Sequence, residues 1–481
     1  MKTIRKKYRN LPVQIKASLW FLVCSFMQKG ITTVTTPIFT RLLSTAEYGQ
    51  YGVFSSWLSI ASIFVTLNLS LGVYSQGVVK FEDERKVFSS ALQGLTFVLC
   101  LAWTLVYTLF RDFWNRLFSL STVQMYAMLS LIWTSAVFNF WASEQRVLYR
   151  YKSLVALTSL VSIAKPALGV FLVCQAEDKV TARILGWCIV ELVCYSGLFF
   201  IQMWRGRQFF SARFWKYAVK FNIPLIPHYL SLTVLNSADR IMIKYMTGEA
   251  DAGVYSLAHA VSLIMTLFNT ALTQTVSPWV FQKIKANKIE DISPVGYISL
   301  VCVAGVNLLL IALAPEAVAL FAPKAYYDAV YIIPPVAMSV YFMYSYDLFA
   351  KFAFYYEKTN FIMTASVVGA LLNIVLNYIF IGLFGYKAAG YTTLVCYAVY
   401  SVGHYIFMNK VCDRFCDGIR PYDLKKLLRI TILFVTAGFL LLLTYGHALI
   451  RYGILAAGLV LVIVKRGTLM SAAKNLLAIK K

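Results

Sequence analysis

Hydrophobic residues along the chain fall into long runs between about residue 17 and residue 465, and short, mostly basic segments separate these runs. Each run reaches the roughly 20 residues that a helix needs to cross the hydrocarbon core of a bilayer. The runs lack the alternation of membrane β-strands, and lipid leaves no backbone group unpaired, so each run predicts a helix. The pattern predicts about fourteen spans, over residues 17–40, 48–74, 87–110, 121–144, 153–174, 181–203, 217–240, 253–281, 293–314, 329–350, 359–384, 388–409, 428–445 and 449–464.

Composition agrees with an all-α membrane protein. Of the 481 residues, 59% are hydrophobic and 14% are charged, and no segment fits a water-soluble domain. Most of the 45 lysines and arginines lie on the side of the N-terminus if the spans alternate, which predicts that both termini are cytoplasmic. This topology and the anionic inner leaflet account for the net charge of +24, so the charge does not indicate nucleic-acid binding.

A short motif occurs twice at the start of a predicted span. Glu47, Gly49 and Tyr51 of STAEYGQY recur at one constant offset as Asp251, Gly253 and Tyr255 of GEADAGVY. Six predicted helices separate the copies, so both halves enter the membrane from the same side, as parallel repeats of transporters do. We expect a structural role for the motif, with the acid near the positive end of the following helix and the glycine permitting a tight entry.

The sequence resembles a known family of transporters. The stretches PIFTRLLSTAEYGQY, NSADRIMIKYMTGEADAGVY and AAGYTTLVCYAVYSVGHY, followed by two trailing helices, are similar to those of bacterial polysaccharide repeat-unit flippases (Wzx-type). These belong to the multidrug/oligosaccharidyl-lipid/polysaccharide exporter superfamily. The resemblance covers essentially the whole chain.

The resemblance implies an architecture and an activity. It implies two six-helix bundles around a V-shaped lumen, over residues 1–210 and 211–412, with two trailing helices and a basic tail over residues 413–481. It also implies a flippase of the cytoplasmic (inner) membrane that moves polyprenyl-pyrophosphate-linked oligosaccharide by alternating access for O-antigen, capsule or exopolysaccharide synthesis. The expected partners are this lipid-linked substrate, the lipid bilayer, and polysaccharide polymerase and chain-length proteins.

Two lysines inside predicted spans are candidates for contact with an anionic pyrophosphate. Lys29 lies near the middle of the first span, and Lys165 lies before Pro166 in the fifth. A lysine at such a depth is costly unless it faces a cavity or a partner, so both are expected to point inward. The alternative for Lys165 is a structural ion pair with Glu191, and for Lys29 a bond that packs one helix on another.

The second half contributes further candidate charges. Asp239 and Arg240 end the seventh span, where an interfacial salt bridge or a snorkelled side chain is the favoured interpretation. Asp347 and Lys351 are four residues apart in the tenth span and are expected to share a face and pair.

Two histidines are candidates for a proton carrier or a gate. His228 follows Pro224 and Pro227, which are expected to kink the seventh span, and His259 lies in the eighth. A single histidine on an apolar helix is more often bound by a neighbouring carbonyl, and that alternative is the favoured one here.

No enzymatic signature occurs. The sequence contains no P-loop, catalytic triad or metal-ligand cluster, so we predict transport without catalysis, cofactor or metal. The alternatives are a cation-coupled multidrug antiporter of the same superfamily and a flippase for the peptidoglycan lipid precursor. Cation-coupled antiporters resemble one another in placing an aspartate in the first helix, whereas the first span here carries Lys29 and no acid.

Overall fold

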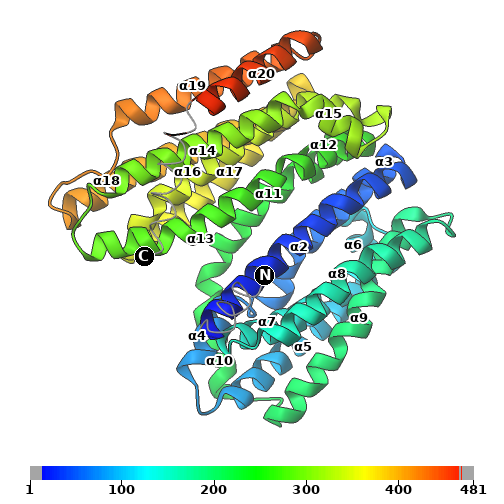
Figure 1. Ribbon diagram of the computed structural model, residues 1–481. Helices are drawn as coiled ribbons and strands as arrows, with labels where there is room; N and C mark the ends of the chain where they lie inside the picture. The colour runs from blue at the N-terminus through cyan, green and yellow to red at the C-terminus, as the bar shows by residue number, and fades with distance from the viewer. Residues whose placement is uncertain (1–12, 465–466, 468–481) are drawn as a thin grey trace, which may run out of the picture. The chain divides into compact units, whose positions relative to one another are not determined.

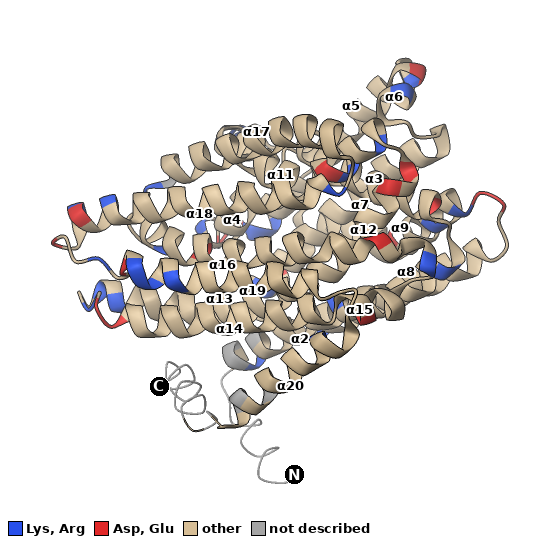
Figure 2. Cartoon of the chain, turned by 90° about the horizontal axis from the view of Figure 1, so that it is seen from above, with Lys and Arg blue, Asp and Glu red and all other residues tan. Residues whose placement is uncertain are grey.

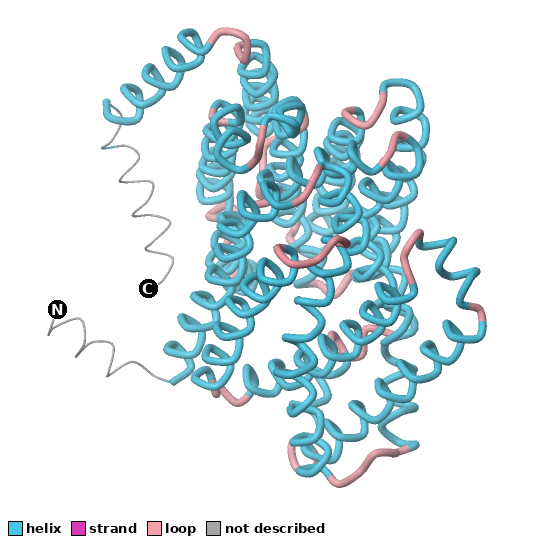
Figure 3. The backbone as a smooth tube through the Cα atoms, turned by 90° about the vertical axis from the view of Figure 1, so that its right-hand side faces the viewer, coloured by secondary structure: helices cyan, strands magenta, loops and turns pink. Residues whose placement is uncertain are grey.

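The computed structural model describes residues 13–464 and residue 467. This part of the chain consists of helices joined by short loops and contains no strand (Figure 3). The chain divides into two compact units, Met1–Ser237 and Ala238–Lys481, and the division falls inside one helix, α11 (Ile226–Met246).

The first unit can be followed in Figure 1 from blue to green. Its elements before α11 are α2 (Val13–Leu42), α3 (Thr45–Thr66), α4 (Val73–Lys80), α5 (Arg85–Leu109), α6 (Arg111–Phe118), α7 (Thr122–Val147), α8 (Tyr151–Val173), α9 (Lys179–Gly206), α10 (Ala212–Asn222) and the 3₁₀ helix η1 (Ile223–Leu225). The second unit continues with α12 (Glu249–Ser262), α13 (Ile264–Lys285), α14 (Ile292–Ala312), α15 (Ala314–Phe321), η2 (Lys324–Tyr331), α16 (Ile333–Tyr355), α17 (Thr359–Phe384), α18 (Ala388–Phe415), α19 (Leu424–Leu443) and α20 (Ala448–Val464).

Every hydrophobic run predicted as a span coincides with helical structure. Among the described residues, 8 helices are long and apolar enough to cross a membrane, or 9 if η2 and α16, bent by 47°, form one span. Figure 2 shows that charged residues lie mainly near helix ends and that the long middle stretches are largely uncharged. The all-α, multi-pass membrane fold expected from the sequence is therefore confirmed.

The first unit is built around α9, which packs against α5, α7 and α8. The backbones of α8 and α9 approach closely at two glycines, because a Cβ on Gly186 would lie 2.7 Å from the Cα of Gly169. Small residues permit such approaches in membrane helices, where dispersion contacts rather than water exclusion hold helices together. This crossing sets the facing positions of Lys165 and Glu191.

The second unit is built around α16, which packs against α13, α14 and α18. From Ile333 to Tyr341 every residue of α16 is buried, and Tyr344, Leu348 and Phe352 continue the buried face. Helix α17 packs on α18, and α19 packs on α14 and α16. A helix that is apolar and covered on most sides is typical of the centre of a membrane bundle.

Both copies of the repeated motif begin a helix, as expected. Ser44 caps α3, where the Ser44 side chain accepts a hydrogen bond from the Glu47 amide and the Glu47 carboxylate accepts one from the Ser44 amide. Asp251 lies in the first turn of α12, beside Glu249, which forms an ion pair of 3.2 Å with Lys244. Gly49 and Gly253 are both buried. Both acids of the motif thus lie in the first turn of a helix, near its positive end.

Prolines interrupt the predicted span 217–240, also as expected. Amphipathic α10 ends at Asn222, one 3₁₀ turn contains Pro224, and α11 starts with Pro227 in its first turn. Proline lacks an amide hydrogen and so suits the start of a helix rather than its middle. The run read as one span therefore comprises a short helix, a turn and a long helix.

Candidate functional site

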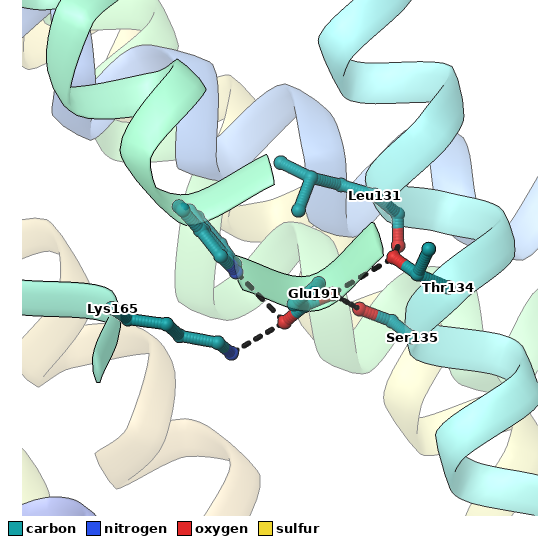
Figure 4. Close-up of polar contacts among 6 residues, drawn as sticks. Leu131, Thr134, Ser135, Lys165 and Glu191 are labelled. Atoms are coloured by element: carbon teal, nitrogen blue, oxygen red, sulfur yellow. Dashed lines mark hydrogen bonds and ion pairs between the residues drawn. The ribbon is translucent and has the colours of Figure 1, made fainter. Parts of the chain in front are cut away.

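The first candidate site is centred on the Glu191 carboxylate of α9, which is buried with 3% of its side chain exposed. Figure 4 shows Lys165 of α8 reaching it from one side and Thr134 and Ser135 of α7 from the other. The hydroxyls of Thr134 and Ser135 each donate to Oε2 across 3.0 Å, and the indole of Trp187 donates to Oε1 across 2.8 Å. Lys165 forms an ion pair with Oε1.

The side chain of Lys165 is more exposed than that of its partner Glu191. Its side chain is 28% exposed, and its ammonium lies 5.4 Å from the centre of the Trp187 ring and 5.9 Å from that of Tyr195. Cation–π attraction to such rings supplements the ion pair. Glu191 thus has three neutral donors besides Lys165. The pairing considered as an alternative from the sequence is confirmed, whereas contact of Lys165 with cargo stays a prediction.

The first unit contains a second buried acid, Glu144, which the hydropathy pattern did not indicate. Glu144 of α7 accepts a hydrogen bond of 2.9 Å from Gln202 of α9, and Gln202 in turn accepts one of 2.6 Å from Gln93 of α5. All three side chains are buried. Glu144 stands at the end of the predicted span 121–144, where hydropathy does not mark an acid as buried. Gln93 and Gln202, inside two other predicted spans, were the available signal.

The second unit holds its own buried carboxylate, Asp239 of α11, which is 2% exposed. It accepts hydrogen bonds from Tyr255 of α12 at 2.5 Å, from Asn377 of α17 at 2.6 Å and from Thr393 of α18 at 2.8 Å. The snorkelled side chain considered for Asp239 is wrong, because the carboxylate is buried and is held by neutral donors of α12, α17 and α18. Hydropathy could not reveal this, since it carries no information on packing partners.

Asp347 and Lys351 form the pair expected from their spacing, with Lys351 Nζ 2.5 Å from Asp347 Oδ2. Thr273 of α13 donates a further hydrogen bond of 2.9 Å to the same oxygen. Lys351 is the buried partner, with 3% of its side chain exposed against 33% for Asp347. The pair thus presents its carboxylate, rather than its ammonium, to the surroundings.

The remaining candidates occupy separate places. Lys29 is exposed on α2, and Arg240 is partly buried beside Asp239 on α11. His228 is partly buried near the start of α11, with its ring 5.8 Å from that of Tyr229, whereas His259 is buried in α12, 6.1 Å from the Tyr255 ring. The structure therefore joins Lys165 to Glu191 and Asp347 to Lys351, and it gathers no three His, Cys, Asp or Glu side chains into a metal site within the described residues.

The two tyrosines of the repeat have different partners. The Tyr255 hydroxyl binds Asp239, whereas the Tyr51 ring lies 3.5 Å from the guanidinium carbon of Arg183, which also contacts the Phe39 ring at 3.8 Å. Each tyrosine thus ties the start of a repeat to a charged group of its own unit, through the hydroxyl in one case and the ring in the other.

Comparisons with known proteins identify relatives by sequence and by fold. The family model described as "Polysaccharide biosynthesis protein" matches residues 15–284, and a second model, described as "MatE", matches residues 224–379. A protein named "Lsg locus putative protein 1" from Haemophilus influenzae is 22% identical over 386 residues, covering 74% of this chain and 88% of that protein. An "Uncharacterized membrane protein" of the same organism is 21% identical over 375 residues, with the same two coverages.

Solved structures share the fold at low sequence identity. A structure of the lipid II flippase MurJ in an inward closed conformation has a TM-score of 0.73 and 14% identity, covering 94% of this chain and 99% of that chain. An inward-facing multidrug resistance MATE family transporter of the MOP superfamily has a TM-score of 0.60 and 12% identity, covering 80% of this chain and 95% of that chain. At these identities the likeness concerns the arrangement of helices.

Proposed function

Because the chain belongs to the family of polysaccharide biosynthesis proteins, we propose that it is a flippase of the cytoplasmic membrane for polyprenyl-pyrophosphate-linked oligosaccharide. The observation that carries the proposal is the family match over residues 15–284, more than half of the chain. The multi-pass helical fold agrees with it. Export of O-antigen, capsule or exopolysaccharide units is the process that such a protein serves.

In this proposal Lys165 exchanges its partner during transport. The pyrophosphate of the cargo carries more negative charge than one carboxylate and attracts the partly exposed ammonium away from Glu191. Glu191 meanwhile stays hydrogen-bonded to the hydroxyls of Thr134 and Ser135 and to the Trp187 indole. The buried carboxylate is therefore never without a hydrogen-bond donor. Return of Lys165 to Glu191 favours release of the cargo. Lys29, exposed on α2, adds positive potential in the same unit.

The flippase proposal is tested by deleting the gene from a strain without a paralogue. We expect lipid-linked oligosaccharide to accumulate on the cytoplasmic leaflet and surface polysaccharide to disappear, and we expect a plasmid copy to restore both. Normal surface polysaccharide in the deletion strain would refute the proposal. Drug sensitivity with intact polysaccharide would favour the multidrug antiporter, and arrest of peptidoglycan synthesis would favour a flippase for its lipid precursor.

A further inference from the structure

Helix α10 is amphipathic, and one of its faces packs against other helices of the first unit. Phe214, Ala218 and Asn222, spaced four apart, are buried, whereas Lys216 and Lys220 on the opposite face are exposed. The helix packs on α4 and α5. Residues four apart share one face of a helix, so this pattern separates an apolar side from a cationic side.

Specific contacts hold α10 in place. The Trp215 indole donates a hydrogen bond of 2.8 Å to the carbonyl of Ala91 in α5, and the Asn222 amide donates one of 2.9 Å to the carbonyl of Leu67. The exposed face of α10 is therefore presented by a fixed helix rather than by a free loop.

Three segments that adjoin α10 or its packing partner α5 carry further exposed cations. Lys80 at the end of α4 lies with its ammonium 4.9 Å from the Tyr217 ring of α10. The end of α9 meets the start of α5 so closely that a Cβ on Gly206 would lie 2.2 Å from the Lys86 carbonyl. We call the exposed cations gathered in this way the α10 platform: Lys80, Lys86, Arg205, Arg207, Lys216 and Lys220.

The acids beside the platform do not neutralise it. Glu84 forms an ion pair of 2.8 Å with Arg213, and Glu82 forms one of 3.3 Å with Arg85. Asp83 is the remaining acid of that loop. Within residues 13–464, no member of the α10 platform takes part in an ion pair, so the platform carries a large excess of positive charge.

Apolar side chains are exposed beside these cations. Trp204 is 74% exposed, Phe210 59% and Ile223 50%. Aromatic and aliphatic groups next to lysines are typical of segments at the boundary between headgroups and acyl chains. A soluble acidic protein would match the charge but would leave these apolar side chains uncovered, whereas a lipid offers both a phosphate and an acyl chain.

We propose that the α10 platform binds the headgroups of anionic phospholipids at the membrane surface. The lysines and arginines contact the phosphates, and Trp204, Phe210 and Ile223 insert among the adjacent acyl chains. Helix α10 leads through η1 directly into α11, so bound lipid steadies the start of α11. The proposal does not depend on what the protein transports.

The test uses the purified full-length protein in lipid nanodiscs or mixed micelles, with phosphatidylglycerol as the anionic probe and phosphatidylcholine as the neutral one. We expect phosphatidylglycerol to bind at least about tenfold more tightly, and Lys216→Gln with Lys220→Gln to remove most of this preference. Lys216→Arg with Lys220→Arg should retain it, since charge is kept. Both residues are exposed, so a matching elution volume and circular dichroism spectrum are expected for every variant.

A matched control separates this platform from a general effect of charge. Lys425→Gln with Lys426→Gln removes the same charge from exposed positions at the start of α19, and we expect it to leave the lipid preference almost unchanged. Equal binding of the two lipids, equal losses in the two double variants, or full competition by inorganic phosphate alone would each overturn the proposal.

Discussion

The hydroxyl of Tyr255 lies 2.5 Å from Oδ2 of Asp239 and donates a hydrogen bond to this buried carboxylate. Tyr255→Phe should lower the free energy of unfolding by about 1–3 kcal/mol, because it leaves a buried acceptor with one donor fewer. Thermal unfolding of the purified variant measures this loss. The repeat supplies the control, since Tyr51→Phe keeps the ring that stacks on Arg183 and should have little effect. Equal losses at the two tyrosines would contradict the assignment.

Separate measurements of stability and transport distinguish the two roles of Lys165. Lys165→Gln should destabilise the protein by about 1–3 kcal/mol, less than for a fully buried pair because the lysine is partly exposed. Adding Glu191→Gln removes the unpaired charge and should restore abundance in the membrane. If Lys165 binds cargo, transport should remain low in this double variant and should be partly retained in Lys165→Arg. Recovery of wild-type transport in the double variant would leave Lys165 a purely structural role.

Alanine substitutions at two glycines of α9 test the close approach of α8 and α9. Gly186→Ala places a methyl group 2.7 Å from the Cα of Gly169, so the helices must separate, at a cost of about 1–3 kcal/mol. Gly197→Ala meets no atom within 4 Å and should be neutral or slightly stabilising, because alanine favours helix. Thermal unfolding of the two variants side by side makes the comparison. A Gly186 variant as stable as the Gly197 variant would rule out the tight crossing.

We predict that the protein loses stability in acid when the carboxylate of Asp423, the residue that caps α19, is protonated. Its carboxylate accepts a hydrogen bond of 3.0 Å from the Lys426 amide, and this bond holds the pKa of Asp423 below the ordinary value of 3.8. A lowered folded-state pKa means that the contribution is complete above the ordinary pKa and is lost as the pH falls through the lower one. Unfolding curves between about pH 5 and pH 2 should show that Asp423→Asn, whose amide oxygen still caps the helix, loses less stability than the wild type. Parallel curves for the two proteins would disprove the effect.

The parallel repeat predicts the sidedness of its two entry loops. In a background carrying Cys174→Ser, because Cys174 is exposed, single cysteines at Ala46 and Ala250 stand immediately before the two acids of the motif. Both should react with a membrane-impermeant thiol reagent in intact cells, and a cysteine at Lys288 should react only after lysis. Labelling of one entry loop without the other would refute the parallel arrangement.

The membrane fold was predictable because the cost of unpaired backbone in lipid forces long apolar runs into helices. The two ion pairs were predictable because a charge inside the membrane needs a partner of opposite charge. For Lys165 the partner Glu191 lies at a similar depth in the next predicted span, and for Asp347 the partner Lys351 lies four residues along the same helix. The breaks were predictable only where proline marks them. Span 48–74 divides between α3, which ends at Thr66, and α4, which begins at Val73, and no proline stands there, so this break was not predicted.

The environment of Asp239 could not be read from the chain because neutral residues supply it. Asn377 and Thr393 lie more than a hundred residues away in sequence, and neither has a charge that hydropathy would register. Asn373 and Asn377, four apart in the apolar second half of α17, were a visible signal of a polar face there. Which helix that face meets depends on tertiary packing.

The division of the chain inside α11 has a consequence for how the protein is made. The first half of α11 belongs to the first unit, and the second half, from Ala238, belongs to the second. During translation, α11 is therefore complete only after the first residues of the second unit have been synthesised. Helices form cooperatively, and a half-made α11 offers too few turns to be stable alone. A gene split at Ser237 should therefore yield two fragments that are degraded, because neither fragment contains the whole of α11.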